Sequence, residues 1–275
     1  MSVLPTLTLI GAGRVGRTLG RLWHTQQVLQ IQDVLTTAPE RAQAAVHFIG
    51  AGRAVAGLDT MRPAQAWLLA VPDRQIAACA HALAQSDHPP SLAFHASGAL
   101  PAAELAPLQA AGWSIASAHV LLSFADPETV QQQLTGSPCA LEGEAAAIDL
   151  LRPWFEAVGA RCFALSAEHK LLYHAGAVWA TNFLPVLQAQ AEALWQSSGM
   201  PAELLPDVRA RLLHNAVHNL LALGPAQALT GPAARGDTAL VQRQAAALTA
   251  MDADTGAAYQ ALSALAARLA RDGRL

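Results

Sequence analysis

The stretch LTLIGAGRVG at residues 7–16 decides the fold of the first part of this chain. Residues 7–10 predict a short buried strand, and residues 14–24 have the apolar spacing of a helix. The glycines between them follow the pattern G-x-G-x-x-G, which permits a tight turn, a close approach by a pyrophosphate and close helix–strand packing. The free N–H groups at the helix start would bind the phosphates. This context predicts a dinucleotide-binding turn made by Gly11, Ala12, Gly13, Arg14, Val15 and Gly16.

Two other interpretations of this turn stay open. It could be a glycine turn without a ligand, or a nucleotide site like that of methyltransferases. A second glycine-rich stretch, Gly50-Ala51-Gly52-Arg53, lacks the third glycine and precedes no clear helix. We therefore predict no nucleotide site at residues 50–53.

The end of the second expected strand, residues 33–37, bears on the choice of dinucleotide. NAD sites usually carry a carboxylate there, which binds the ribose 2′-hydroxyl. This strand instead ends in Thr36-Thr37-Ala38, and Asp33 stands at its expected start. Thr37 could donate to a 2′-phosphate, and Arg41 follows one helical turn later, although Arg41 could also be an ordinary exposed helix residue. The pattern favours NADP, with NAD as the weaker alternative.

Strand-like and helical segments alternate through the first half of the chain. Further strands are expected at residues 67–71, 92–95, 114–118, 139–141 and 161–165. Strands separated by helices pair in parallel, which predicts an α/β fold with a doubly wound sheet of the Rossmann type. After Ser166 the pattern is helical throughout, with one long helix over residues 168–198 bent near Pro185. We predict a dinucleotide-binding domain over residues 1–165 and an all-helical domain over residues 166–275.

Composition excludes several classes of protein. The 275 residues are 53% hydrophobic and only 13% charged, with a formal net charge of −3, which argues against disorder and against nucleic-acid binding. The apolar stretch 171–187 contains His174, Asn182 and Pro185, so we expect a buried helix rather than a membrane span.

The termini and the cysteines predict a cytoplasmic protein. The N-terminus lacks the basic region of a signal peptide. The three cysteines, Cys79, Cys139 and Cys162, form no C-x-x-C pair, and their odd number does not suit a closed disulfide framework. This favours the reducing cytoplasm.

Polar residues follow several expected strands, where ligands of open α/β sheets bind. Val71 ends one expected strand and Pro72 follows it, and His95 ends the next strand, with Ser97 shortly after; we assign these four to the cofactor site. His119 follows the strand at 114–118 and is a candidate catalytic residue. There are also structural alternatives: these residues could be ordinary polar residues of loops, Asp73 could cap a helix, and His95 could be a hydrogen-bonded core histidine.

The helix that opens the second domain carries a second polar cluster. Lys170, His174, Ala177 and Thr181 lie within about 60° of one another around the helix axis, with Asn182 at the margin. A lysine and a histidine in an apolar helix cost free energy unless they are paired or hydrated, which suggests a site. The alternative is a lysine at an exposed helix start with a hydrogen-bonded histidine behind it. We predict Lys170 and His174 as catalytic residues and Asn182 as a substrate ligand.

Two features of the helical domain are candidates for ligand binding. Arg235, in the turn GPAARGD at residues 231–237, could bind an anionic group of the substrate or pair with Asp237 within a capped turn. His214 and His218 are spaced for metal chelation but lack further ligands in a zinc pattern, so we expect no metal.

Several segments together resemble a bacterial family of Rossmann-like proteins regarded as NADP oxidoreductases, with a C-terminal helical domain of unknown function. The segments that carry the resemblance are GAGRVG at 11–16, VPD at 71–73, HASG at 95–98, SAH at 117–119, SF at 123–124, KLLYHAGAV at 170–178, NF at 182–183 and GPAARGD at 231–237. One departure is Val120, where the family tends to have proline. More distantly, the architecture is similar to ketopantoate reductases, β-hydroxyacid dehydrogenases and pyrroline-5-carboxylate reductases.

The resemblance implies an NADP-dependent oxidoreductase acting on a small carbonyl, imine or hydroxyacid, without naming the substrate. β-Hydroxyacid dehydrogenases pair an active-site lysine with an asparagine one helical turn later, whereas Lys170 is followed at that spacing by His174. We expect Lys170 to donate a proton and His174 to relay it. The alternatives are a non-enzymatic NADP-binding or redox-sensing protein, and a structural or S-adenosylmethionine-type domain. The apolar helices of the second domain predict a homodimer.

Overall fold

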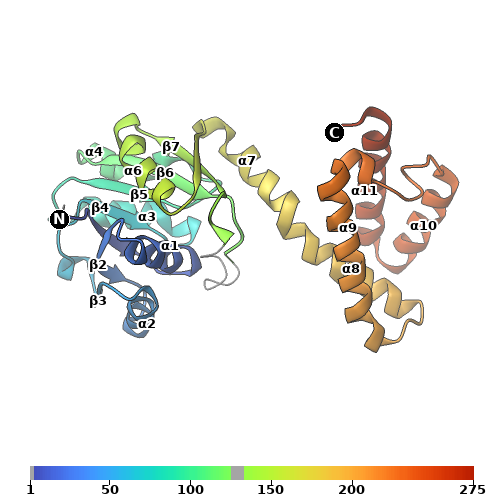
Figure 1. The fold of residues 1–275 in the computed structure, drawn as a ribbon, viewed down its shortest axis with the longest axis horizontal. Coiled ribbons are helices and arrows are strands. Elements are labelled where there is room, and N and C mark those ends of the chain that lie inside the picture. The colour runs from blue at the N-terminus through green and yellow to red at the C-terminus, as the bar shows by residue number, and fades with distance from the viewer. Residues whose placement is uncertain (1–2, 125–132) are drawn as a thin grey trace. The chain divides into compact units, whose positions relative to one another are not determined.

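The computed structural model describes residues 3–124 and 133–275, and the chain divides into two compact units, Met1–Leu184 and Pro185–Leu275 (Figure 1). The expected boundary at 165 follows the change from strands to helices. The structure groups the next helix with the sheet, because Lys170 and Tyr173 on that helix hydrogen-bond to two residues of the sixth strand and to the loop after the fifth. The functional division into a cofactor domain and a substrate or dimerisation domain stays a prediction.

The first unit is built on an eight-stranded sheet in the order β3-β2-β1-β4-β5-β6-β7-β8. Its strands are β1 (Thr6–Ile10), β2 (Gln30–Leu35), β3 (Arg53–Val55), β4 (Ala66–Leu69), β5 (Leu92–His95), β6 (Ser114–Val120), β7 (Pro138–Gly143) and β8 (Arg161–Ala164). The strands from β1 to β6 are parallel, which confirms the α/β, Rossmann-type class. β7 runs antiparallel to β6, so the expectation of parallel pairing throughout was wrong at this edge.

Helices cover both faces of this sheet (Figure 1). They are α1 (Arg14–Thr25), α2 (Pro39–Ile49), α3 (Asp73–Ala84), α4 (Ala106–Ala110) and α6 (Ala145–Ala157). Residues of α1, α2 and α6 pack in one apolar cluster with strand residues such as Leu9 and Phe94. Residues of α3 and α4 pack in a second cluster with Trp67 and Leu69. Neighbouring residues of a strand point to opposite faces, so Leu68 and Leu69 belong to different clusters.

Two sequence predictions about the strands need correction. β2 begins at Gln30, so Asp33 lies in mid-strand rather than at its start. β3 was not predicted, because three residues are too few for an alternating pattern to stand out.

The predicted long helix is α7 (Lys170–Ala177), a π-helical turn (Val178–Asn182) and α8 (Phe183–Ser197) in direct succession. The irregularity therefore precedes Pro185 instead of coinciding with it. Pro185 is the third residue of α8 and follows the π-helical turn directly. The π-turn, a feature often found at functional sites, brings Thr181 and Asn182 into the lining of a cavity.

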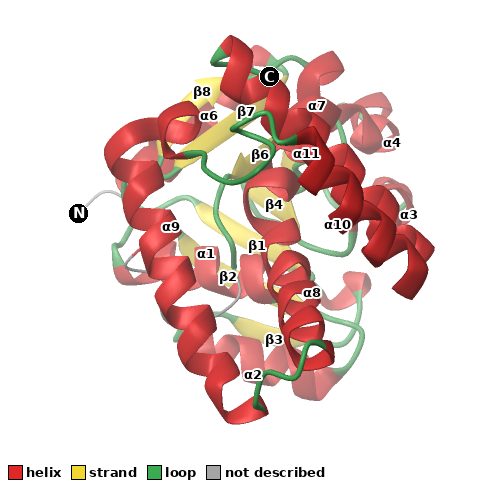
Figure 2. Cartoon of the chain, turned by 90° about the vertical axis from the view of Figure 1, so that its right-hand side faces the viewer, coloured by secondary structure: helices red, strands yellow, loops and turns green. Residues whose placement is uncertain are grey.

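Residues 185–275, all of which are described, form helices and turns without a strand (Figure 2). After α8 come α9 (Leu205–Ala228), kinked at Gly224, then α10 (Thr238–Met251) and α11 (Ala253–Asp272). The carboxylates of Asp237 and Asp252 accept hydrogen bonds from backbone N–H groups and cap α10 and α11. Among the described residues, no helix has the length and apolarity needed to cross a membrane.

Candidate functional site

The three glycines of the turn between β1 and α1 serve three different purposes. Gly11 has φ +86°, and a Cβ there would lie 2.6 Å from the carbonyl oxygen of Ala70. A Cβ on Gly16 would lie 2.8 Å from the Cβ of Ala70, so this glycine permits close packing of α1 on β4. A Cβ on Gly13 would meet no atom within 4 Å. Protein atoms therefore fill the space beside Gly11 and Gly16, whereas the space beside Gly13 is free.

The N-terminus of α1 is suited to an anion. No side chain caps it, and its first turn contains no acidic residue. Its N–H groups and the positive end of the helix dipole are thus available for a phosphate. The open space at Gly13 lies at this terminus, so the residues present fit the pyrophosphate of a dinucleotide.

Asp33 is not available to a ribose. It is fully buried and accepts hydrogen bonds from the guanidinium groups of Arg53 (3.0 Å) and Arg62 (2.7 Å) and from the backbone N–H of Arg62 (2.7 Å). Burial alone would raise the pKa of Asp33, but the bonds from Arg62 and Arg53 hold it below its ordinary value. The chain end of β2 presents Thr37 instead, which is exposed, as is Arg41 in the first turn of α2.

The second glycine-rich stretch has a structural explanation. Gly50 ends α2 in the left-handed conformation, with φ +84°, and its N–H donates to the carbonyl of Val46. Arg53 starts β3 and pairs with Asp33. The stretch thus closes a helix and supplies a partner for a buried carboxylate.

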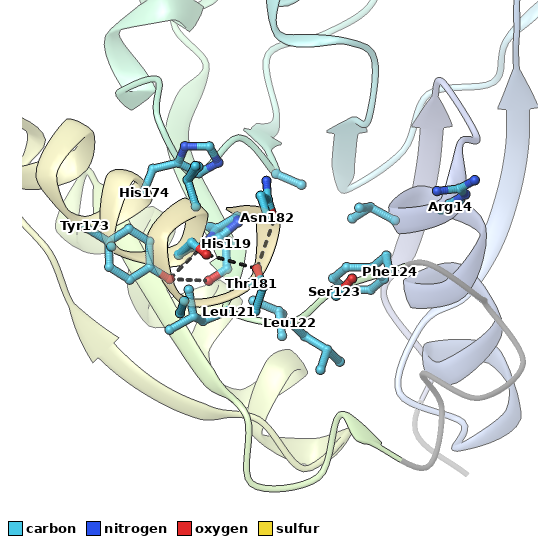
Figure 3. A pocket seen from close by; sticks show the side chains of 18 of the residues that line it. Arg14, His119, Leu121, Leu122, Ser123, Phe124, Tyr173, His174, Thr181 and Asn182 are labelled. Atoms are coloured by element: carbon cyan, nitrogen blue, oxygen red, sulfur yellow. Dashed lines mark hydrogen bonds between the residues drawn. The ribbon is translucent and has the colours of Figure 1, made fainter. Parts of the chain in front are cut away.

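A cavity of about 780 Å³ joins the glycine turn to the predicted catalytic region (Figure 3). Arg14 and Val15, at the start of α1, line one side of the cavity, whereas His119, Tyr173 and His174 line the opposite side. Its lining is completed by Leu19, Ala96, Ala118, Val120, Leu121, Leu122, Ser123, Phe124, Gly176, Ala177, Val178, Ala180, Thr181 and Asn182. All these residues belong to the first unit.

His119, Tyr173, His174 and Gly98 form one contact cluster at this cavity. The hydroxyl of Tyr173 lies 2.9 Å from Nδ1 of His119, and the two imidazole centroids are 5.9 Å apart. A Cβ on Gly98 would lie 2.6 Å from Cδ2 of His174 and 2.8 Å from Nε2 of His119. The glycine therefore lets both rings approach the backbone that follows β5.

Burial determines the protonation states in this cluster. It lowers the pKa of His119 to about 4, with further contributions from His174 and Lys170, and raises the pKa of Tyr173 to about 12. Both groups are therefore neutral near pH 7. The 2.9 Å distance is that of a hydrogen bond between the Tyr173 hydroxyl and Nδ1 of His119, whose direction depends on the tautomer of the ring, and the same hydroxyl lies 3.4 Å from the backbone carbonyl oxygen of His119.

Lys170 lies beneath this cluster and does not line the cavity. Its side chain is 1% exposed, and its ammonium donates to the hydroxyl oxygen of Ser117 (2.6 Å) and to the carbonyl oxygen of Ser97 (3.1 Å). Burial lowers its pKa, opposed by the charges of Glu142 and Asp73. The alternative of a lysine at an exposed helix start is therefore wrong, and contact with a substrate stays a prediction.

His95 and Ser97 are used within the protein. Nε2 of His95 donates to the carbonyl of Pro101 (3.0 Å), while its Nδ1 accepts from the N–H of Ser97 (3.2 Å). The hydroxyl of Ser97 donates to Asp73 (2.7 Å). Burial lowers the pKa of His95 to about 4, so it is a neutral, hydrogen-bonded core histidine. Neither residue lines the cavity, and their cofactor contacts stay predictions, as do those of Val71 and Pro72.

Three residues of this region were not predicted from the sequence: Gly98, Tyr173 and Phe124. The segments HASG, KLLYHAGAV and SF contained them, and the first two of these segments also contain a histidine, which was the available signal. Arg235 belongs to the second unit, whereas the described cavity lies in the first, so its role in substrate binding stays a prediction.

Residues 137–266 match the family model described as a domain of unknown function, DUF2520. The matched segment runs from the start of β7 into α11 and includes Tyr173 and His174, but neither the glycine turn nor His119. It confirms the resemblance to Rossmann-like proteins with a C-terminal domain of unknown function. A search of curated proteins found no match.

Solved structures show the same fold as this chain. Protein TM1727 from Thermotoga maritima is 22% identical, with TM-score 0.75, over 98% of this chain and 100% of that one. A protein from Bacteroides fragilis described as a candidate NADP oxidoreductase is 19% identical, with TM-score 0.77, over 96% and 98%. A reductive aminase from Aspergillus terreus, in complex with NADPH and ethyl-5-oxohexanoate, is 19% identical, with TM-score 0.65, over 99% and 95%.

Proposed function

We propose that this protein is an NADP-dependent oxidoreductase that acts on a small carbonyl, imine or hydroxyacid. The observation that carries the proposal is the single cavity lined by the start of α1 on one side and by His119, Tyr173 and His174 on the other. A site for cofactor phosphates is thereby joined to groups that can hold and move a proton. The NADPH complex of the structurally similar reductive aminase supports the same cofactor class.

The nicotinamide cofactor would supply or accept the hydride, and the protein would orient the reactants and move the proton. Arg14, Val15 and the N–H groups at Gly13 would hold the pyrophosphate. The neutral Nε2–H of His119 would donate a hydrogen bond to the reacting oxygen or nitrogen of the substrate, with Tyr173 fixing the tautomer. His174 would supply or take the proton on the same wall, and the amide of Asn182 would orient the substrate.

In this proposal Lys170 is a positioning residue. Its ammonium connects α7 to Ser97 beyond β5 and to Ser117 in β6, and so holds Tyr173 and His174 against the strands. His95 stabilises the same loop through Ser97 and Pro101. Both would act through the residues they hold rather than by touching substrate.

Thr37 and Arg41 would bind the 2′-phosphate and make NADP the preferred cofactor over NAD. The support is that both are exposed at the chain end of β2, while Asp33 is buried in its ion pairs. An Arg41→Ala variant should lose roughly tenfold in NADPH affinity, as expected for one charge-assisted contact, and keep its NADH affinity. Arg161→Ala, which removes an exposed arginine elsewhere in the unit, is the matched control. Equal losses for both cofactors would refute this assignment.

We further propose a homodimer formed through the helical unit. Large apolar side chains on α9 are exposed, among them Leu212, Leu220 and Leu221, the last by 83%. Surfaces of this kind are usually covered in solution. Light scattering at micromolar concentration should give twice the chain mass, and a monomer mass would refute the dimer.

The first experiment is a fluorescence titration of the purified protein with NADPH and, separately, with NADH. We expect tight NADPH binding, abolished in Gly13→Asp, where a carboxylate would occupy the open space above α1. Ala103→Asp, which adds the same charge at an exposed turn residue, should bind as the wild type does. Absence of binding to either cofactor would overturn the proposal.

Turnover is tested separately, with NADPH and a panel of small ketones, aldehydes and cyclic imines. Consumption of NADPH that requires His119 would support the enzyme. Cofactor binding without turnover on any member of the panel, in either direction, would instead favour a non-enzymatic NADP-binding protein.

A further inference from the structure

Cys139 and Cys162 face each other across two neighbouring strands. β7 and β8 are parallel, and these two cysteines are direct register partners. Side chains of paired residues in a parallel ladder point to the same side of the sheet. Both cysteines accordingly pack in the apolar cluster beneath α6.

The spacing of the two backbones suits a covalent bond. Adjacent strands lie about 4.8 Å apart, and disulfides bridge Cα atoms that are about 4.4–6.8 Å apart. The Sγ of Cys162 lies 3.9 Å from the carbonyl oxygen of Arg152 in α6, on the side of the sheet where Cys139 is also packed. No large movement of the backbone is therefore needed to join them.

The two thiols differ in a way that assigns their roles. Cys139 is fully buried, whereas Cys162 is partly exposed. The neighbouring Cys139 lowers the pKa of Cys162, against the opposing effects of burial and of the charge of Glu156, whereas the interaction with Cys162 and burial both raise the pKa of Cys139. A partly exposed cysteine with a lowered pKa beside a second thiol is the arrangement found in redox-sensing cysteines.

We propose that Cys139 and Cys162 form a reversible redox pair, in which Cys162 reacts with a low-molecular-weight disulfide and Cys139 resolves the adduct. The Cys162 thiolate attacks one sulfur of a disulfide such as oxidised glutathione, which forms a mixed disulfide and releases one thiolate. Cys139 then loses its proton and attacks the sulfur of Cys162, releasing the second thiol. In total, two protein thiols are oxidised to one disulfide, and one small disulfide is reduced to two thiols.

The pair lies next to the candidate site. Ala140, which follows Cys139, is the register partner of His119. Phe163, which follows Cys162, contacts the ring of Tyr173, with centroids 6.0 Å apart. A bond between the two strands would therefore join the backbone positions that brace His119 and Tyr173.

The test treats the native, fully reduced protein with oxidised glutathione and measures its mass without reduction. We expect the wild type to lose two hydrogens and to carry no lasting glutathione, with peptide mapping showing a Cys139–Cys162 cross-link that dithiothreitol reverses. In Cys139→Ala the glutathione should remain on Cys162. Cys162→Ser should form no cross-link, and Cys79→Ser, in which both partners remain, should behave as the wild type does.

Three results would overturn the proposal. The first is a wild type that keeps a stable glutathione on Cys162, the second is a wild type that stays fully reduced, and the third is a cross-link that appears only after denaturation. The measurement needs neither cofactor nor substrate, so its outcome is independent of the proposed enzymatic function. If Cys139→Ala fails to fold, the cross-link map of the wild type and Cys79→Ser still decides.

Discussion

The ammonium nitrogen of Lys170 lies 2.6 Å from the hydroxyl oxygen of Ser117, inside the protein and behind the wall of the cavity. A lysine so buried has lost its hydration, and the hydroxyl of Ser117 and the carbonyl of Ser97 take the place of water. The residue that the sequence suggested as a proton donor is thus placed to hold α7 against β6. The groups that face the cavity are its neighbours on the same helix, Tyr173 and His174.

Replacing Lys170 by methionine tests this role. The side-chain volume is similar, but α7 loses its polar connection to the strands. We expect kcat to fall by as much as roughly a hundredfold, as for other small misplacements of reacting groups, with the NADPH Kd nearly unchanged. The shape of the pH–rate profile should be preserved. Loss of one limb of that profile would show instead that Lys170 itself donates the proton.

Stability should fall steeply in acid, because His95 and His119 are neutral when folded. Their folded pKa of about 4 lies below the ordinary value of 6.5, so the unfolded chain binds more protons between these values. Protonation of these two histidines therefore leaves the free energy of unfolding unchanged above pH 6.5. As the pH falls towards 4, it lowers the free energy of unfolding by up to about 3 kcal/mol for each histidine. Urea unfolding at pH 7 and pH 4.5 measures this. His95→Gln should flatten the dependence, and an unchanged slope would contradict the assignment.

Asp33→Asn should destabilise the fold without changing cofactor preference. The buried carboxylate forms ion pairs with Arg53 and Arg62. Removing one partner of a buried ion pair lowers the free energy of unfolding by about 3 kcal/mol. We expect a smaller loss here, because both arginines are half exposed. Thermal unfolding and the NADPH-to-NADH affinity ratio are the two measurements. Asp87→Asn, at an exposed position, is the control. A shift of the ratio towards NADPH would mean that Asp33 reaches the ribose after all.

Gly98→Ala should impair catalysis while sparing cofactor binding. The added methyl group would come within 2.6 Å of His174 and 2.8 Å of His119, so at least one ring must move. We expect a loss of roughly tenfold or more in kcat and an NADPH Kd within twofold of the wild type. Ala103→Ser, which adds one atom to an exposed residue, is the control. Full activity in Gly98→Ala would mean that the two imidazoles are not part of the reacting site.

Local patterns in the sequence determined the Rossmann-type class and much of the element order. Residues 7–16 form a strand, a turn and a helix start within one continuous stretch, so the spacing of the glycines is sufficient to predict them. The caps at Asp237 and Asp252 are local in the same sense, because each carboxylate binds an N–H three residues later. Hydrophobic periodicity and helix caps are properties of neighbouring residues and can be inferred without the fold.

The tertiary structure alone decided which distant residues meet. Strand register joins Cys139 to Cys162, the packing of α7 against β6 joins His119 to Tyr173, and the segment before β4 brings Arg62 to Asp33; no local pattern specifies these contacts. The burial of Lys170 was also beyond the sequence, because an ammonium can be exposed or buried according to the partners that packing brings to it. The sequence by itself thus determined the fold class and a short set of polar candidates. Packing decided which of them line the cavity and which hold the structure behind it.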